Sequence, residues 1–337
     1  MNTSPHRQVR WAVVGSGGIA RRTVGDLRLC ADAQVVAVCS RELSRAQAFA
    51  TEHGLPQAFG DFGALCASDA VDALYIGTPH STHFALASQA LRAGKHVLCE
   101  KPLTMTADEA LALGRLAEEH GVFLMEAMWM KFSPAMRKAV ELVQAGAIGE
   151  PRLLQAGLGY PVPASGPARF WDAALGGGAL YDMAVYSLTL AQMFLGPIER
   201  LEATGTMRPD GVDLESCLTL HHAGGAMAQV ATSITSMIPP RGWLSGRRGA
   251  IDFKEPLFSP AGFKLVTGQP PAPPTVEELD FPREGAGYVP MFRAVNAAIL
   301  AGATAHPLHP VSATAEVLQT LQHAQALLAA ERDQAAR

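Results

Sequence analysis

A lysine follows an apolar run at the point where a buried strand is expected to end. Leu98 and Cys99 lead directly into Glu100, Lys101 and Pro102. In an open α/β sheet, ligands bind beyond the carboxyl ends of the strands, so an amine placed there would face a substrate. Proline pushes the preceding residue out of the α region, which keeps Lys101 extended. Lys101 is therefore a candidate catalytic residue, with an ordinary surface lysine as the alternative on these residues alone.

A glycine-rich turn near the N-terminus fits a dinucleotide. The first apolar run leads into a G-x-G-x-x-A pattern that would open a helix. Such glycines allow a tight turn and a close approach of the backbone to a pyrophosphate, which the helix N-terminus attracts. The alternative is a glycine-rich turn without a ligand. The predicted cofactor-binding residues of this turn are Gly15, Ser16, Gly17, Gly18, Ile19 and Ala20.

The second apolar run ends without a carboxylate. NAD-binding proteins place an acidic residue about twenty positions after the fingerprint, where it binds the ribose diol. Here Ser40 and Arg41 stand at that point, and Arg45 lies one helical turn further on. A guanidinium matches phosphate oxygens in a bidentate way. These three residues predict NADP as the cofactor, with NAD as the alternative. The alternative role of Arg41 is only to cap the strand.

A polar turn follows the third apolar run. It contains Thr78, Pro79, His80 and His83. Two histidines three residues apart could bind a metal, but no acidic or cysteine partner stands nearby at ligand spacing. We therefore expect no metal site, and we expect these residues to bind the cofactor or to cap the helix that begins near Phe84.

The elements that must position these turns alternate regularly. Apolar runs and helical patterns follow one another from residue 10 to about 122, as in βαβ repeats around a buried parallel sheet. The pattern predicts a doubly wound Rossmann sheet in an α/β protein. Expected strands are 11–14, 35–39, 73–76, 96–99 and 122–125, and expected helices are 44–53, 84–93 and 107–120, the last with a Thr106 and Glu109 capping box.

The pattern changes after residue 126. Strand-like runs separated by turn signals predict an antiparallel sheet, and the proline-rich stretch 256–274 is expected to be a surface excursion. The predicted domains are therefore an NAD(P)-binding domain over 1–126 and a substrate-binding and dimerisation domain over 127–337. Expected elements are helices at 134–145, 288–301 and 313–332 and strands at 152–159, 200–207, 214–222, 226–235, 242–245 and 250–253.

Composition narrows the class of partner. The 337 residues carry a net charge of −4 without long single-sign runs, which argues against nucleic acid or an anionic membrane as partner. No apolar run is long enough to cross a membrane, and the first ten residues lack the apolar segment of a signal peptide. The five cysteines show no CxxC spacing and are expected to be reduced core residues. We expect a cytoplasmic protein that binds a small molecule.

The motifs together resemble the glucose-fructose oxidoreductase, inositol dehydrogenase and MocA family, often written Gfo/Idh/MocA. The resemblance implies a Rossmann domain and a C-terminal α+β domain with a large open antiparallel sheet. A tyrosine at position 186, where many members have histidine, is similar to the branch with dimeric dihydrodiol dehydrogenase and NADP-dependent D-xylose 1-dehydrogenases. The stretch 159–169 matches no family pattern. The matching motifs are Gly15 to Ala20, Thr78-Pro79-His80 with His83, Glu100-Lys101-Pro102, and Gly176 to Leu180 with Asp182 and Tyr186.

Asp182 and Tyr186 could complete the chemistry. Oxidation of an alcohol carbon needs a hydride acceptor and a base for the hydroxyl proton, and a nicotinamide provides only the acceptor. On a helix, residues four apart share a face. We hypothesise that Tyr186 is the general acid/base and that Lys101 hydrogen-bonds the substrate hydroxyl and the nicotinamide ribose. Asp182 would bind substrate hydroxyls or orient the pair, and the alternative for Tyr186 is an ordinary core residue.

Two further residues are weaker candidates. Trp129 would either line the nicotinamide or fill the domain junction, and Arg169 would either reach the substrate or be a solvated charge beside aromatic residues. The predicted function is an NADP-dependent dehydrogenase or reductase of a sugar or diol. A sensor that binds NAD(P) or sugar without turnover and a redox-neutral enzyme that retains its nicotinamide are the alternatives. A sheet face without helical cover predicts a homodimer.

Overall fold

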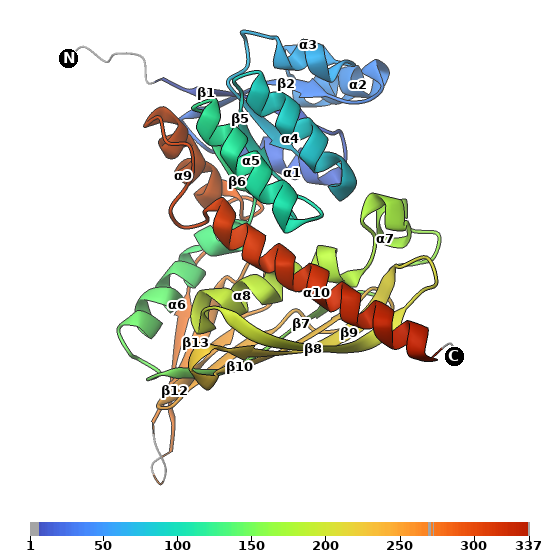
Figure 1. Cartoon of the computed structure of the whole chain (residues 1–337). Coiled ribbons are helices and arrows are strands. Elements are labelled where there is room, and N and C mark those ends of the chain that lie inside the picture. The colour runs from blue at the N-terminus through green and yellow to red at the C-terminus, as the bar shows by residue number, and fades with distance from the viewer. Residues whose placement is uncertain (1–6, 269–270, 272, 336–337) are drawn as a thin grey trace, which may run out of the picture. The chain divides into compact units, whose positions relative to one another are not determined.

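The chain forms two compact units, each made of two stretches of sequence (Figure 1). The structure is a computed structural model that describes residues 7–268, 271 and 273–335. The first unit contains residues 1–129 and 283–315, and the second contains 130–282 and 316–337. The predicted domains, 1–126 and 127–337, assign residues 283–315 to the C-terminal domain. In the structure this segment packs within the first unit.

The first unit is built on a six-stranded parallel sheet with strand order β3-β2-β1-β4-β5-β6. The predicted Rossmann sheet is thereby confirmed. Its strands are β1 (Val9–Val14), β2 (Ala33–Cys39), β3 (Gln57–Phe59), β4 (Ala73–Ile76), β5 (His96–Cys99) and β6 (Leu124–Glu126). Its helices are α1 (Gly18–Leu27), α2 (Leu43–His53), α3 (Phe62–Cys66), α4 (His83–Arg92), α5 (Ala107–Glu119) and α9 (Val289–Leu300), with the 3-10 turn η1 (His80–Thr82).

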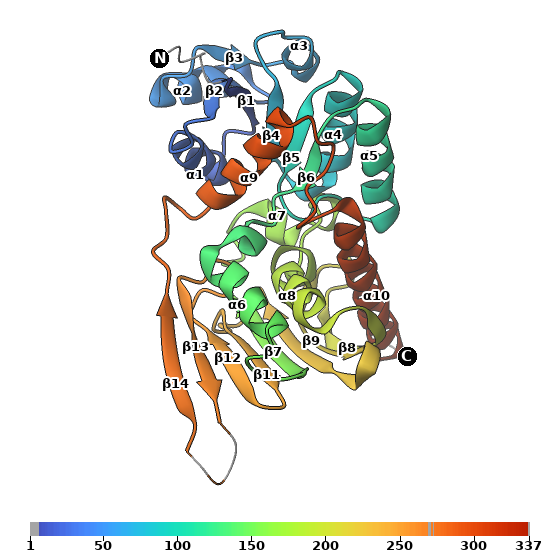
Figure 2. The ribbon, with the colours of Figure 1, turned by 90° about the vertical axis from the view of Figure 1, so that its left-hand side faces the viewer.

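Helix α9 explains why a C-terminal segment belongs to this unit. Asn296 of α9 accepts a hydrogen bond from the indole N–H of the fully buried Trp11 at 2.9 Å. Phe292 packs edge-on against Trp11 and Tyr75. Figure 2 shows α1 and α9 on one side of the sheet and α4 and α5 on the other. The sheet therefore depends on residues far along the chain for part of its cover.

Most local predictions in the first unit agree with the structure. Thr106 and Glu109 form the predicted capping box at the start of α5. Strand β6 begins two residues later than expected and ends on Glu126. The short β3 and α3 were not predicted, because three and five residues give too little periodicity to recognise.

The second unit contains a mostly antiparallel eight-stranded sheet with order β14-β13-β12-β11-β7-β10-β9-β8. Strands β7 and β10 are the parallel pair, and several helical segments and two strands lie between them in the chain. The strands are β7 (Pro151–Gly159), β8 (Ile198–Met207), β9 (Asp213–His222), β10 (Met227–Ser233), β11 (Gly242–Gly246), β12 (Gly249–Phe253), β13 (Gly262–Thr267) and β14 (Thr275–Asp280).

The expectation of a surface excursion over 256–274 is wrong for its centre. Strand β13 lies inside it, and Phe263 and Leu265 are buried on the same face of the sheet. The flanking prolines masked a period-two pattern that spans only six residues. The remaining elements are η2 (Trp129–Phe132), α6 (Pro134–Gln144), α7 (Ala168–Trp171), η3 (Ala173–Leu175), η4 (Leu180–Ala184), α8 (Val185–Leu195), η5 (Ala223–Gly225) and α10 (Val311–Ala335).

The two faces of the eight-stranded sheet differ in composition. One row across the strands is buried and apolar, and it consists of Leu265, Ile251, Leu244, Leu154, Ala228, Leu220 and Leu201. The next row points to the opposite face and is more exposed, and it consists of Glu278, Lys264, Asp252, Trp243, Gln155, Gln229, Thr219 and Glu202. Register alone thus creates one core face and one open face.

Cysteine burial departs from the prediction at one position. Cys30, Cys39, Cys66 and Cys99 are buried, but Cys217 is exposed. Cys217 lies on β9 next to the buried Leu218, so its side chain points to the open face. Among the described helices, none combines the length and hydropathy needed to cross a bilayer.

Candidate active site

The glycine-rich turn after β1 leaves room for a phosphate. Gly15 has φ +106°, and a Cβ there would lie 2.8 Å from the carbonyl oxygen of Gly77, so only glycine fits. Nothing lies within 4 Å of a Cβ built at Gly17 or Gly18. Helix α1 begins at Gly18, and no side chain caps it. The turn therefore presents an open cradle at a helix N-terminus, which fits the pyrophosphate of a dinucleotide.

The end of β2 lies beside this turn. The Gly15 N–H donates to the Cys39 carbonyl at 2.8 Å, and the hydroxyls of Ser16 and Ser40 are 3.4 Å apart. Arg41 and Arg45 are exposed at the start of α2. The structure thus brings together the predicted pyrophosphate turn and the residues predicted to hold a 2′-phosphate.

His83 connects the turns that follow β4 and β5. Its Nε2 lies 2.9 Å from the Thr78 carbonyl oxygen, and its Nδ1 lies 2.9 Å from the Pro102 carbonyl oxygen. A neutral imidazole can donate to only one carbonyl at a time, whereas the imidazolium donates to both. Burial lowers the pKa of His83, and the two carbonyls work against that shift. His83 therefore positions two turns rather than capping α4, and His80 is buried beside it.

The turn that carries Lys101 is held by a series of buried groups. The Tyr75 hydroxyl donates to one carboxylate oxygen of Glu100, and the Lys101 N–H donates to the other at 3.2 Å. The next two residues are held by His83, through the Pro102 carbonyl, and by Glu126, through the Leu103 N–H at 2.9 Å. The half-buried Lys101 thus stands in a backbone that is fixed on both sides.

Glu126 is itself fixed by residues from the end of the unit. His309 Nε2 donates to its Oε2 at 2.7 Å, and the Thr314 hydroxyl donates at 3.2 Å. Burial alone would raise the pKa of Glu126, but the hydrogen bond and charge of His309 outweigh it and lower that pKa. The pair is almost fully buried, at 3% and 0% side-chain exposure. It forms a second layer behind the Lys101 turn.

Sequence reasoning missed this second layer. Glu126 ends a short apolar run, and a carboxylate at a strand end is a signal that could have been used. His309 and Thr314 lie in and after a proline-rich loop, and nothing local links them to β6.

Trp129 stacks on Tyr288 with ring centres 4.2 Å apart and an interplanar angle of 2°, a contact within the first unit.

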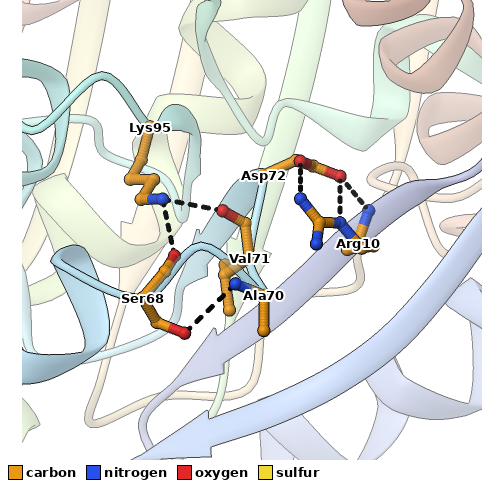
Figure 3. A network of polar contacts seen from close by, with 6 residues as sticks. All are labelled: Arg10, Ser68, Ala70, Val71, Asp72 and Lys95. Carbon is orange, nitrogen blue, oxygen red and sulfur yellow. Dashed lines mark hydrogen bonds and ion pairs between the residues drawn. The ribbon is translucent and has the colours of Figure 1, made fainter.

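The opposite end of the same sheet carries a polar network of a different kind (Figure 3). Arg10 and Asp72 form a bidentate ion pair, with Nη2 to Oδ1 at 2.6 Å and Nε to Oδ2 at 3.0 Å. Lys95 Nζ donates to the carbonyls of Ser68 and Val71, both at 2.8 Å. Burial raises the pKa of Asp72, but the Arg10 hydrogen bonds outweigh it and lower that pKa. These groups join the starts of β1, β4 and β5.

The three glycines before Asp182 serve three different needs. Gly176 ends η3 in the left-handed region with φ +76°. A Cβ at Gly177 would lie 2.8 Å from the Asp172 carbonyl oxygen. Gly178 has φ +120°, and a Cβ there would lie 2.0 Å from a carboxylate oxygen of Asp213. The run is therefore required by the local backbone.

Asp182 lies in a π-helical turn, and Tyr186 lies in the first turn of α8. The expected single α-helix thus begins as η4, a widened turn of the kind often found at functional sites. Arg169 Nη1 lies 3.0 Å from Asp182 Oδ1, and its guanidinium covers the Phe170 ring at 3.9 Å. Tyr186 is 7% exposed, with its ring 5.5 Å from that of Phe258. The structure brings Arg169 and Asp182 together as an ion pair.

Within the described residues, no group of three or more histidine, cysteine or acidic side chains could hold a metal ion. The first unit thus carries a dinucleotide turn and an amine held at a strand end, and the second unit carries a carboxylate and a phenol at the start of a helix.

Two family profiles match the chain in succession. Residues 9–128 match the oxidoreductase family with an NAD-binding Rossmann fold, and residues 136–252 match the GFO/IDH/MocA C-terminal domain. The protein is thus an NAD(P)-binding oxidoreductase by fold and site. It belongs to the Gfo/Idh/MocA family, as its motifs predicted.

Several named proteins are similar over most of the chain. Trans-1,2-dihydrobenzene-1,2-diol dehydrogenase of Mus musculus is 34% identical over 81% of this chain and 82% of its own. The Homo sapiens enzyme of that name is 31% identical over 94% of this chain and 96% of its own. KijD10, a 3-ketoreductase from Actinomadura kijaniata solved with NADP and TDP-benzene, superimposes with a TM-score of 0.84 at 28% identity, covering 96% of this chain and 98% of its own.

Proposed function

We propose that the protein is an NADP-dependent dehydrogenase or reductase that acts on a hydroxyl-bearing carbon of a sugar or diol. The observation that carries the proposal is the Lys101 turn, in which Tyr75, His83 and Glu126 hold Glu100, Pro102 and Leu103, and Glu100 accepts the Lys101 N–H. An exposed surface lysine does not need such support. The similar proteins are named for the oxidation of a diol and the reduction of a ketone, which are two directions of one chemistry.

Tyr186 is the proposed general acid/base. In the oxidation, the ionised phenol oxygen takes the proton of the substrate hydroxyl, and a hydride leaves the carbon that bears this hydroxyl. In the reduction, the phenol returns the proton to the carbonyl oxygen. Lys101 is proposed to hydrogen-bond the reacting oxygen, and an ammonium lowers the pKa of a phenol that lies near it. A bound nicotinamide supplies the hydride acceptor or donor. The 3-ketoreductase was also solved as a lysine-to-alanine and a tyrosine-to-phenylalanine variant.

Asp182 and Arg169 are proposed to bind the substrate. Their ion pair places a carboxylate and a guanidinium together, and both groups hydrogen-bond vicinal hydroxyls. Arg169 is 44% exposed at its side chain, and Asp182 is 16% exposed. The stretch 159–169 that precedes this pair follows no family pattern, so we propose that it sets which sugar or diol is used.

The choice of NADP rests on the end of β2. Ser40, Arg41 and Arg45 offer one hydroxyl and two guanidinium groups, and no carboxylate ends this strand. A carboxylate there would bind a ribose diol but repel a 2′-phosphate. The remaining proposed cofactor contacts are Gly15 to Ala20, Thr78, Pro79, His80, His83, Glu100, Lys101 and Trp129.

A spectrophotometric assay tests the function. We expect absorbance at 340 nm to change with NADP and a panel of aldoses, inositols and trans-diols, with a KM for NADP lower than for NAD. Tyr186→Phe should lower kcat by about 10²–10⁴-fold while NADP binding stays within a few-fold. Retention of half the activity would remove Tyr186 from the mechanism. NADPH binding without any turnover would identify a sensor, and nicotinamide that stays bound through purification would indicate a redox-neutral enzyme.

The open face of the eight-stranded sheet is the proposed homodimer interface. Its exposed row centres on Trp243, which is 38% exposed beside Gln155, and the face carries a hollow of about 700 Å³. Aromatic residues are enriched in protein interfaces. Light scattering at micromolar concentration should give twice the chain mass, and Trp243→Glu should return it to one. A monomeric wild-type protein would contradict the proposal.

The free cysteines support a reducing, cytoplasmic location.

A further inference from the structure

A buried carboxylate lies at the base of the turn that carries Asp182 and Tyr186. Asp213, the first residue of β9, has 0% exposure. Its Oδ2 accepts the N–H of Ala179 at 2.9 Å and the N–H of Leu180 at 2.8 Å. These are the last residue before η4 and the first residue within it. Asp213 therefore fixes the beginning of the segment that leads to Tyr186.

The fit between Asp213 and the turn is close on both sides of the carboxylate. Gly178 presses its Cα against Oδ1, so that an added Cβ would lie 2.0 Å from this oxygen. Among the described residues, Asp213 Oδ1 is buried without a hydrogen-bond partner. The carbonyl of Ala179 accepts the Thr232 hydroxyl at 3.3 Å, which ties the same turn to β10.

No ion pair offsets the charge of this carboxylate in the part of the chain that the structure describes. Burial raises its pKa to about 6, opposed by the N–H groups of Leu180, Ala179 and Asp213 itself. Strand β10, which also packs on η4, carries no charged residue. The titratable side chains on the other neighbouring elements are Tyr181 and Asp182 on η4, Tyr186 on α8, Glu215, Cys217, His221 and His222 on β9, Glu199, Arg200 and Glu202 on β8, Arg152 on β7, Arg208 and Asp210 before β9, and Arg169 and Asp172 before the glycine run.

We propose that Asp213 is a positioning residue for hydride transfer: its ionised carboxylate holds the two N–H groups that set the place of Asp182 and Tyr186, and protonation releases them. The inference rests on the proposed role of Tyr186. Hydrogen bonds to a charged acceptor are about twice as strong as those to a neutral one.

The pH dependence of kcat tests the inference. In the wild type, kcat should fall on the acid side with a midpoint near the pKa of about 6 given by burial of Asp213. Asp213→Asn keeps the acceptor oxygen and removes the charge, so its kcat should be lower by about 10–100-fold, the range expected for a displaced reacting group. This low kcat should be flat through the wild-type acid limb, with an unchanged KM for NADP.

Asp210→Asn is the matched control. Asp210 lies in the same hairpin and is exposed, with an ion pair to Arg208 and a hydrogen bond from the Val212 N–H. Its variant should keep the wild-type kcat and acid limb. If Asp213→Asn also keeps both, Asp213 is not a positioning residue.

An infrared measurement on the wild type covers the case in which Asp213→Asn does not fold. A buried carboxylic acid has a resolved C=O stretch, which should appear on acidification with the same midpoint as the loss of kcat. A missing band, or a midpoint that differs from the kinetic one, would overturn the inference. Tyr186→Phe, assayed in parallel, separates the two proposals: full activity in that variant removes the role of Tyr186 and leaves the infrared band unaffected.

Discussion

The two ends of the parallel sheet in the first unit use charged groups in opposite ways. At the amino ends of the strands, Arg10 pairs with Asp72 at 41% and 30% side-chain exposure (Figure 3). At the carboxyl ends, His83, Glu100 and Glu126 are buried and bind backbone atoms of the turns. Exposed charges that form an ion pair with each other hold strands together. Buried groups that hydrogen-bond to the backbone of a turn instead fix the position of the side chain on that turn.

The same contrast has an energetic side. Exposed ion pairs contribute about 0.2–1 kcal/mol to the free energy of unfolding, whereas loss of one partner of a buried pair costs about 3–5 kcal/mol. Burial of the charged groups at the carboxyl ends therefore costs desolvation free energy, and loss of one partner lowers the free energy of unfolding strongly. Fixing Lys101 is the function that we assign to them.

The largest expected difference between the two ends concerns their lysines. Lys101→Met should lower kcat by about 10²–10⁴-fold, because the reacting oxygen loses its hydrogen-bonded ammonium. Lys95→Met is the matched control at the other end, since Lys95 holds two carbonyls there. Its kcat should equal that of the wild type. Steady-state assays with NADP measure both, and an equal loss of kcat in the two variants would abolish the distinction.

Glu126 should show the largest effect on stability. Glu126→Gln removes the charge that pairs with His309 and should lower the free energy of unfolding by about 3–5 kcal/mol, as measured by urea titration at neutral pH. Because the folded pKa of Glu126 is lowered, its contribution is present above the ordinary carboxyl pKa and is lost as the pH falls through the folded value. A variant as stable as the wild type would show that the pair contributes nothing.

His83 should give an intermediate effect. Phenylalanine keeps a planar ring and removes both ring nitrogens, so His83→Phe should lose the hydrogen bond that the imidazole donates to a turn carbonyl. Loss of one hydrogen bond worth about 1.4 kcal/mol corresponds to a tenfold change. We expect kcat/KM for NADP to fall by about tenfold with the fold intact by circular dichroism. An unchanged kcat/KM would mean that the turns hold their places without His83.

The smallest effect is expected at Asp72. Asp72→Asn should lower the free energy of unfolding by at most about 1 kcal/mol and leave kcat unchanged. The Arg10 hydrogen bonds lower the pKa of Asp72, so this contribution is present above about pH 4 and is lost as the pH falls below it. Urea titrations at pH 7 and pH 3 should therefore differ for the wild type more than for the variant. A loss above 3 kcal/mol would place this pair in the same class as Glu126.

Much of the fold could be predicted from the sequence because its signals are local. The apolar runs, the glycine-rich turn and the Thr106 capping box each depend on fewer than ten consecutive residues. Strand β13 escaped prediction because prolines flank a short alternation around Phe263 and Leu265. Helix α9 was found, but no local pattern could show that Asn296 pairs with Trp11.

The candidate site residues could likewise be predicted only where the sequence signal is local. Gly15 and Lys101 could be found because backbone geometry and strand ends leave a sequence signal. His309 and Asp213 could not, since each acts on atoms of a segment far away in the chain. The pairing of Arg169 with Asp182 could not be predicted either, because the stretch before it has no regular pattern.

The inclusion of residues 283–315 in the first unit has a genetic consequence. A gene shortened to end after β6 would encode all six strands of the parallel sheet, and the product would still lack Asn296 for the Trp11 indole and His309 for Glu126. Neither unit corresponds to one uninterrupted segment of the gene. Recombination that exchanges cofactor domains between relatives must therefore use three crossover points in the coding sequence, near codons 129, 283 and 315.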